Sequence, residues 1–244
     1  HGVTLASVGP SYHNEVPLTV EGPNDGQFRW MIVVDEDRTD INLRSDLDAA
    51  LESLDGGATQ LWIKSIDASA DAVALAAGFK HYRDLWQLRC PLPTAPSHLH
   101  TRGFTPDDLD DYIAVNNRAF SWHPEQGGLT RESVEATMAE PWFDADGFRL
   151  YYEDNKMVGF CWPKIHRDQD PVLGEIYVIA IDTSHHGLGL GKPLSLAGLD
   201  WLAAKGLTTG MLYVESDNQP ANSTYASIGF TRHHTDRAYQ LAPR

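Results

Sequence analysis

The fold is decided by the stretch Gly174-Glu-Ile-Tyr-Val-Ile-Ala-Ile-Asp-Thr-Ser-His-His-Gly-Leu-Gly-Leu-Gly-Lys192. Its apolar, β-branched run from Ile176 to Ile181 predicts a buried strand. A glycine-rich turn follows and leads into a helix-forming segment at 193–205. Such a turn gathers backbone N–H groups and the positive end of a helix dipole in one place, and its glycines admit positive φ angles. The stretch therefore predicts a phosphate-binding site.

Three phosphate-binding patterns can be compared with this turn. A Walker loop needs a hydroxyl residue after its lysine, but Pro193 follows Lys192. A dinucleotide loop needs G-x-G-x-x-G, and the spacing here is G-x-G-x-G with no second βαβ unit after it. The third pattern, Q/R-x-x-G-x-G/A, is the pyrophosphate loop of acyl-CoA enzymes, and the segment His186–Gly191 is similar to it, with His in the first position. A glycine turn that holds no ligand is the alternative interpretation.

Composition indicates a globular protein. The 244 residues are 42% hydrophobic and 22% charged, and the formal net charge of -15 disfavours a nucleic-acid partner. No apolar run approaches the roughly 20 residues that a membrane span needs, so we expect no membrane partner. Cys90 and Cys161 stand in separate contexts, which favours a reducing, cytoplasmic compartment.

The proline-rich segment 91–96 is the best candidate for a linker, because closely spaced prolines make a stiff, extended connection. We therefore expect a first domain at 1–92, a linker at 93–97 and a second domain at 98–244. In the first domain the patterns predict strands at 28–34, 60–66 and 81–90. They also predict helices at 45–54, with Ser45 as N-cap, and at 68–77.

The second domain is expected to run β-α-α-β-β-β-α-β-α-β, beginning with a strand at 99–103. Its strand–helix–Gly-Phe–strand segment at 212–241 resembles the segment at 61–88. Two tandem copies of one fold are therefore expected, with the first copy lacking its opening elements. The predicted class is α/β (α+β), with a mixed central sheet flanked by helices.

The region 98–241 resembles the GNAT-type N-acetyltransferases and, more closely, the second domain of the mycothiol synthase family. The motifs that carry this resemblance are the segments 123–128, 142–144, 164–166, 174–178 and 211–218, together with Tyr225 and Gly229-Phe230. The first half looks like the degenerate N-terminal domain of the same family. Asn42-Leu43-Arg44 stands there where the glycine loop would lie, so we expect no acetyl-CoA in that half.

The resemblance implies transfer of an acetyl group from acetyl-CoA to the cysteinyl amine of cysteinyl-glucosaminyl-inositol. Glu175 would be the general base, because an α-amino group with a pKa of about 7.7–8.0 needs only modest help to lose a proton. Tyr225 would be the general acid for the leaving thiolate. A strand-end surface carboxylate and a core tyrosine are the plainer interpretations of these two residues.

The resemblance also implies binding residues. It assigns the coenzyme to Ile179, Ala180, Ile181, His186, Gly187, Leu188, Gly189, Leu190, Gly191, Lys192, Asn218, Gln219, Pro220, Ala221, Asn222 and Ser223. It assigns the sugar–inositol substrate to Glu125, Lys164, Glu175 and Tyr213. Asn218 could also be a plain helix N-cap. The pairs His185-His186 and His233-His234 suggest metal ligands, but neighbouring side chains diverge, so we expect no metal.

Two other functions remain open on the sequence. One is acetylation of a different amine, and the other is a non-catalytic acyl-CoA-binding protein. The expected partner is a small thiol-sugar substrate, and the chain is expected to be a monomer.

Overall fold

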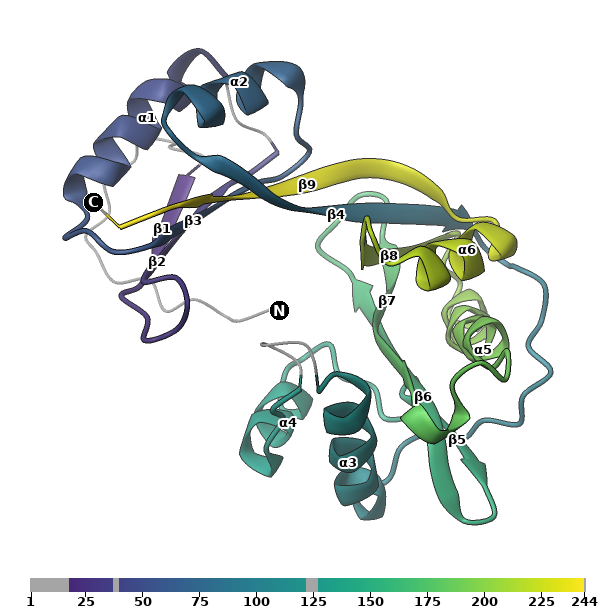
Figure 1. Cartoon of the computed structure of the whole chain (residues 1–244). Coiled ribbons are helices and arrows are strands. Elements are labelled where there is room, and N and C mark those ends of the chain that lie inside the picture. The colour runs from purple at the N-terminus through teal and green to yellow at the C-terminus, as the bar shows by residue number, and fades with distance from the viewer. Residues whose placement is uncertain (1–17, 37–39, 122–126, 244) are drawn as a thin grey trace. The chain divides into compact units, whose positions relative to one another are not determined.

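The computed structural model describes residues 18–36, 40–121 and 127–243 (Figure 1). The chain divides into two compact units, one of 1–83 with 236–244 and one of 84–235. The boundary between residues 83 and 84 lies inside strand β4. The proline segment at 91–96, which the sequence suggested as the linker, begins at the last residue of that strand. The domain bounds expected from the sequence remain a prediction.

The first unit places helices α1 and α2 on a mixed sheet with strand order β1-β2-β3-β9. β2 and β3 run parallel, while β1 and β9 are antiparallel to their neighbours. Its core gathers apolar residues of β2, α1, β3 and α2 with Tyr239 of β9. The elements are β1 (Leu18–Glu21), β2 (Trp30–Val34), α1 (Asp40–Ser53), β3 (Thr59–Ile63), α2 (Ala68–Ala76), the start of β4 (Lys80–Pro91) and the end of β9 (Thr231–Leu241).

The second unit has strand order β4-β8-β7-β6-β5, in which β7 and β8 are parallel and the other named pairs are antiparallel. Its helices α3, α4, α5 and α6 lie on this mixed sheet. The elements are α3 (Leu109–Ala119), α4 (Arg131–Met138), β5 (Arg149–Glu153), β6 (Lys156–His166), β7 (Leu173–Ile181), α5 (Gly191–Ala204), β8 (Thr209–Glu215) and α6 (Gln219–Ile228). The α/β class and the mixed sheet predicted from the sequence are confirmed.

Strand alternation gives the second sheet two different faces. On β6, Cys161 and Ile165 belong to the core that contains α5 and α6 residues. Phe160 and Trp162 belong to the core that contains Tyr112 of α3. Lys164 and His166 continue the second of these faces toward the end of the strand. Lys164 and His166, which line the pocket described below, therefore lie on the same face of the sheet as Phe160 and Trp162.

Each repeat contributes its last strand to the sheet built on the other repeat. The two repeats are β3-α2-β4 and β8-α6-β9, and a glycine with positive φ follows each helix, Gly78 at +90° and Gly229 at +112°. Instead of completing one sheet per repeat, β4 pairs with β8 and β9 pairs with β3. The repeated order of elements was predicted, but this exchange was not.

Two local predictions are wrong. The segment 99–103 forms only an isolated bridge, between Arg102 and Leu150, because a single residue pair does not extend into a ladder. Ser45 lies inside α1, where its hydroxyl donates to the Asn42 carbonyl at 2.9 Å, so it does not cap the helix. Among the described residues, no helix is both long and apolar enough to cross a bilayer.

Candidate functional site

The site is organised around the point where β7 and β8 part. Their parallel pairing covers only Gly174 with Gly210 and Glu175 with Met211, although both strands continue further. Beyond Glu175, β7 keeps its antiparallel pairs with β6 up to Ile181. One edge of the β7 backbone is therefore released from its neighbouring strand, which leaves main-chain groups that an extended ligand can use.

The glycine turn lies just beyond the end of β7. Gly187 and Gly189 have φ angles of +80° and +77°, and a Cβ at either would meet nothing within 4 Å. Conformation, and not lack of space, therefore requires glycine at both positions. The helix α5 begins at Gly191, and its N-cap Leu190 makes no side-chain cap. The first N–H groups of this 14-residue helix are thus open to an anion.

Asp182 anchors the start of this turn. Its buried carboxylate accepts from the Ser184 amide at 3.0 Å and the Ser184 hydroxyl at 2.6 Å, and from Arg118 Nε at 2.8 Å. Burial opposes ionisation, but the Ser184 hydrogen bonds and Arg118 outweigh it and lower the pKa of Asp182 to about 2. The imidazole of His186 turns back on the loop, with Nε2 3.0 Å from the Ile181 carbonyl. These contacts fix the path of the chain from β7 into the turn.

Glu175 lies at the parting point and is only 8% exposed. Its register partner on β6 is Lys164. Its Oε2 lies 2.7 Å from Nε2 of His166, the last residue of β6. Sequence reasoning missed His166 as a site residue. The available signal was its position two residues after Lys164, which puts both side chains on one face of the strand.

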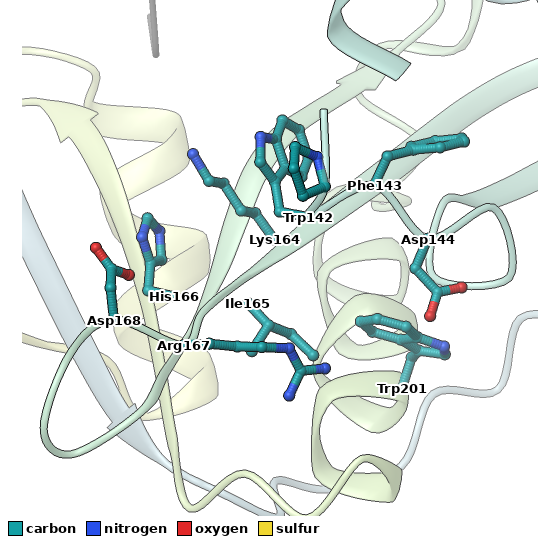
Figure 2. Close-up of a pocket in the computed structure, with 10 residues that line it drawn as sticks. Trp142, Phe143, Asp144, Lys164, Ile165, His166, Arg167, Asp168 and Trp201 are labelled. Atoms are coloured by element: carbon teal, nitrogen blue, oxygen red, sulfur yellow. The ribbon is translucent and has the colours of Figure 1, made fainter. Parts of the chain in front are cut away.

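A pocket of about 510 Å³ opens beside Lys164 and His166 (Figure 2). Its lining residues are Pro141, Trp142, Phe143, Asp144, Lys164, Ile165, His166, Arg167, Asp168 and Trp201. The Lys164 ammonium lies 4.7 Å from the centre of the Trp142 ring and 5.5 Å from that of Tyr177. The pocket thus offers aromatic faces with ionisable groups of both signs, a combination suited to a polar small molecule.

Tyr213 extends the same face of the sheet toward β4. It is 38% exposed, and its hydroxyl accepts a hydrogen bond from Gln87 Nε2 at 2.8 Å. Gln87 is in turn held by Arg89 Nε, which donates to its Oε1 at 2.7 Å. Since Met211 pairs with Glu175 and lies two residues before Tyr213, the register brings Lys164, Glu175 and Tyr213 onto one face.

Tyr225 lies on α6, in the core that covers the opposite face. It is 8% exposed and packs edge-on against Phe230, with ring centres 5.7 Å apart. Burial raises the pKa of Tyr225 well above its ordinary value. Glu175 and Tyr225 therefore flank the parted strands from opposite faces of the sheet.

The start of α6 lies directly after β8. Asn218 caps this helix by accepting from the Ala221 amide at 3.3 Å, so its predicted capping role is confirmed. Asn222 Nδ2 donates to the Glu215 and Ser216 carbonyls, while its buried Oδ1 finds no hydrogen-bond partner within the described ranges.

The substrate contact expected of Glu125 stays a prediction, and His185 was expected to bind no metal. Glu125 lies outside the residues that the structure describes. His185 is engaged with Ser184, whose hydroxyl lies 2.8 Å from its Nδ1. In the described part of the chain, no group of three or more His, Cys, Asp and Glu side chains could hold a metal ion.

Comparison with known proteins places this site in a family context. The family model described as Acetyltransferase (GNAT) family matches residues 114–230. A mycothiol acetyltransferase of Thermomonospora curvata is 42% identical over 202 residues, covering 80% of this chain and 67% of the relative. One from Rhodococcus erythropolis is 39% identical over 225 residues, covering 86% of this chain and 75% of the relative.

Solved structures support the same fold. A GCN5-related N-acetyltransferase from Sphaerobacter thermophilus superposes with a TM-score of 0.70 at 17% identity, covering 92% of this chain and 76% of that chain. A tandem GNAT protein from the clavulanic acid biosynthesis pathway gives a TM-score of 0.58 at 16% identity, covering 86% of this chain and 74% of that chain. Because these sequence identities are low, the two structures support the fold and not a shared function.

Proposed function

Since the chain belongs to the mycothiol acetyltransferase family, we propose that it transfers the acetyl group of acetyl-CoA to the cysteinyl amine of cysteinyl-glucosaminyl-inositol. The observation that carries the proposal is the parting of β7 from β8 at Glu175, next to a glycine turn at the open start of α5. This combination offers main-chain groups to an extended coenzyme and a buried carboxylate to the reacting amine.

The coenzyme would follow the chain from β7 into α5. Backbone groups of 179–181 would hold the pantetheine arm along the released edge of β7. The turn at 186–192 would hold the pyrophosphate, because its amides and the α5 dipole favour negative charge. The segment 218–223 would bind the coenzyme from the side of β8, where Asn218 caps the start of α6.

Glu175 and Tyr225 would carry the proton transfers. As the amine nitrogen bonds to the thioester carbonyl carbon, its proton passes to the Glu175 carboxylate. The carbon–sulfur bond breaks and its electron pair leaves on sulfur. The raised pKa of Tyr225 keeps its hydroxyl protonated, so it can donate a hydrogen bond to the departing sulfur.

The acceptor would occupy the pocket that Lys164 and Trp142 line. Sugar and inositol rings present apolar faces to aromatic side chains and hydroxyl groups to charged ones, and this pocket supplies both. Tyr213 and Glu125 complete the proposed substrate contacts. Lys164 would act by binding the acceptor and not by taking a proton.

The first unit is proposed to bind no acetyl-CoA. The segment Asn42-Leu43-Arg44 forms part of the helix α1 and not a glycine turn. We also propose that the protein acts as a cytoplasmic monomer, where reducing conditions suit its two free, buried cysteines, Cys90 and Cys161.

The test is release of coenzyme A thiol from acetyl-CoA with and without the cysteinylated pseudodisaccharide. We expect release that depends on this acceptor and shows ternary-complex kinetics, because no activated nucleophile is part of the proposed site. A panel of other amines separates this function from a different N-acetyltransferase. Tight acetyl-CoA binding without turnover on any amine would support a non-catalytic acyl-CoA protein and contradict the proposal.

A further inference from the structure

The strongest unassigned feature of the site is the contact between His166 and Glu175. His166 Nε2 lies 2.7 Å from Glu175 Oε2, with the side chains 17% and 11% exposed. This is hydrogen-bond distance between two largely buried groups. An ionised carboxylate can only accept, so Nε2 must carry a hydrogen whenever Glu175 is ready to act as a base. The contact therefore fixes the histidine tautomer.

The two side chains differ in what they face. His166 lines the 510 Å³ pocket, whereas Glu175 is not part of that lining. Figure 2 shows His166 and Lys164 extending from the same strand toward the same side of the pocket. The imidazole thus lines the pocket and also contacts the carboxylate, and this contact of Glu175 is made through Oε2.

We propose that His166 is the positioning residue of the base. Its Nε2–H holds Oε2 and leaves Oε1 of Glu175 directed to the amine of the acceptor. This inference rests on the proposed function, since it needs Glu175 to be the base. A carboxylate held by one hydrogen bond cannot rotate freely, so it spends more of its time in the orientation that accepts the proton.

The proton balance is simple. The amine proton passes to Oε1 of Glu175 as the carbon–nitrogen bond forms, while the Nε2 hydrogen of His166 stays in place throughout. The electron pair of the broken carbon–sulfur bond leaves with the thiolate. After product release, Glu175 returns its proton to solvent. His166 therefore neither gains nor loses a proton in the step itself.

Replacing His166 removes its hydrogen bond to Glu175 and leaves the other surroundings of the carboxylate in place. Other ionisable groups also act on the pair, from the same sheet face and around the pocket: Lys164, Arg167, Asp168, Asp144, Arg89 and Tyr213. All of these are unchanged in a His166 variant, so a change in pH profile can be assigned to the imidazole.

The experiment compares His166→Leu, which removes the N–H donor, with His166→Gln, which keeps an N–H donor but cannot ionise. The matched control is His98→Leu, at an exposed position outside the site. For each variant the rate of acetyl transfer is measured over a pH range that spans the ordinary histidine pKa, together with the KM of both substrates and the Tm.

We expect His166→Leu to lower kcat by roughly tenfold or more. This loss should be smaller than that caused by removing a general base, which lowers the rate by about 10²–10⁴-fold. The KM for acetyl-CoA should not change. His166→Gln should recover most of kcat, because its side-chain amide keeps an N–H donor for Glu175. His98→Leu should match the wild type throughout.

Two results would overturn the inference. In one, both His166 variants keep the wild-type rate and pH profile. In the other, both lose rate equally together with a lower Tm, which is the sign of a purely structural contact. A Glu175→Gln enzyme as active as the wild type would instead remove the base of the proposed function. The two failures are therefore distinguishable.

Discussion

The side-chain amide of Gln87 donates to the hydroxyl of Tyr213 at 2.8 Å, across the antiparallel pair of β4 and β8. Gln87 is 4% exposed, while Tyr213 is 38% exposed. A buried group thus orients an exposed one that faces the proposed acceptor site. β4 comes from the first repeat and β8 from the second, so both repeats contribute to this hydrogen bond.

The first prediction concerns this pair. Gln87→Leu should raise the KM for the acceptor by roughly three- to tenfold, as expected for a lost neutral hydrogen bond worth about 1 kcal/mol. The KM for acetyl-CoA should stay the same. Tyr213→Phe removes the same bond together with the hydroxyl that the acceptor would contact, so its effect on acceptor KM should be at least as large. An unchanged acceptor KM in Gln87→Leu would show that this hydrogen bond does not orient Tyr213 for the acceptor.

Glu175→Gln should lower kcat by roughly 10²-fold or more, because the amide cannot take the amine proton. The change is nearly isosteric, so acetyl-CoA binding should survive, as calorimetry would check. Rapid-quench kinetics should show no covalent acetyl-enzyme in the wild type. A burst of acetylated protein would contradict direct transfer to the amine.

Gly189→Ala should weaken coenzyme A binding, because the residue has φ of +77° and Ala strains this conformation by about 1 kcal/mol. The strain would displace the amides that hold the pyrophosphate. Gly26→Ala is a suitable control, since Gly26 has no positive φ and its Cβ would meet nothing within 4 Å. Equal coenzyme affinities of the two variants, measured by calorimetry, would argue against a pyrophosphate at this turn.

The carboxylate of Asp182 should make the fold sensitive to acid. Its folded pKa of about 2 lies below the ordinary value of about 3.9. A lowered folded pKa stabilises the protein above the unfolded pKa, and that contribution is lost as pH falls toward the folded value. Asp182→Asn should therefore be less stable than the wild type at neutral pH, and the difference should shrink on acidification. Denaturant titrations at several pH values would measure the free energy of unfolding of both proteins. A difference between them that does not change with pH would exclude the Asp182 carboxylate as its source.

Local signals carried much of the sequence prediction. Glycines and a β-branched run mark β7, the turn and α5 to within a few residues, because these preferences act over short distances. The start of α1 was misplaced because the periodic leucines mark the buried face of a helix and not its first residue.

The contact of His166 with Glu175 could not be predicted in the same way. It depends on the register between β6 and β7, and this register shifts at a bulge between Trp162 and Pro163. A one-residue shift moves every later side chain to the other face, and no local pattern fixes where the shift occurs. The pairing of β4 with β8 and of β9 with β3 likewise joins strands far apart in the sequence, and local propensities do not determine it.

That exchange limits how the protein can be divided. A fragment cut at the proline segment 91–96 would leave β8 without its antiparallel neighbour β4, and the other fragment would leave β3 without β9. Open strand edges pair with strands of other chains, so either fragment produced alone should aggregate. A variant of this protein that loses either repeat should therefore lose the folding of the other as well, because each repeat supplies a strand to its partner.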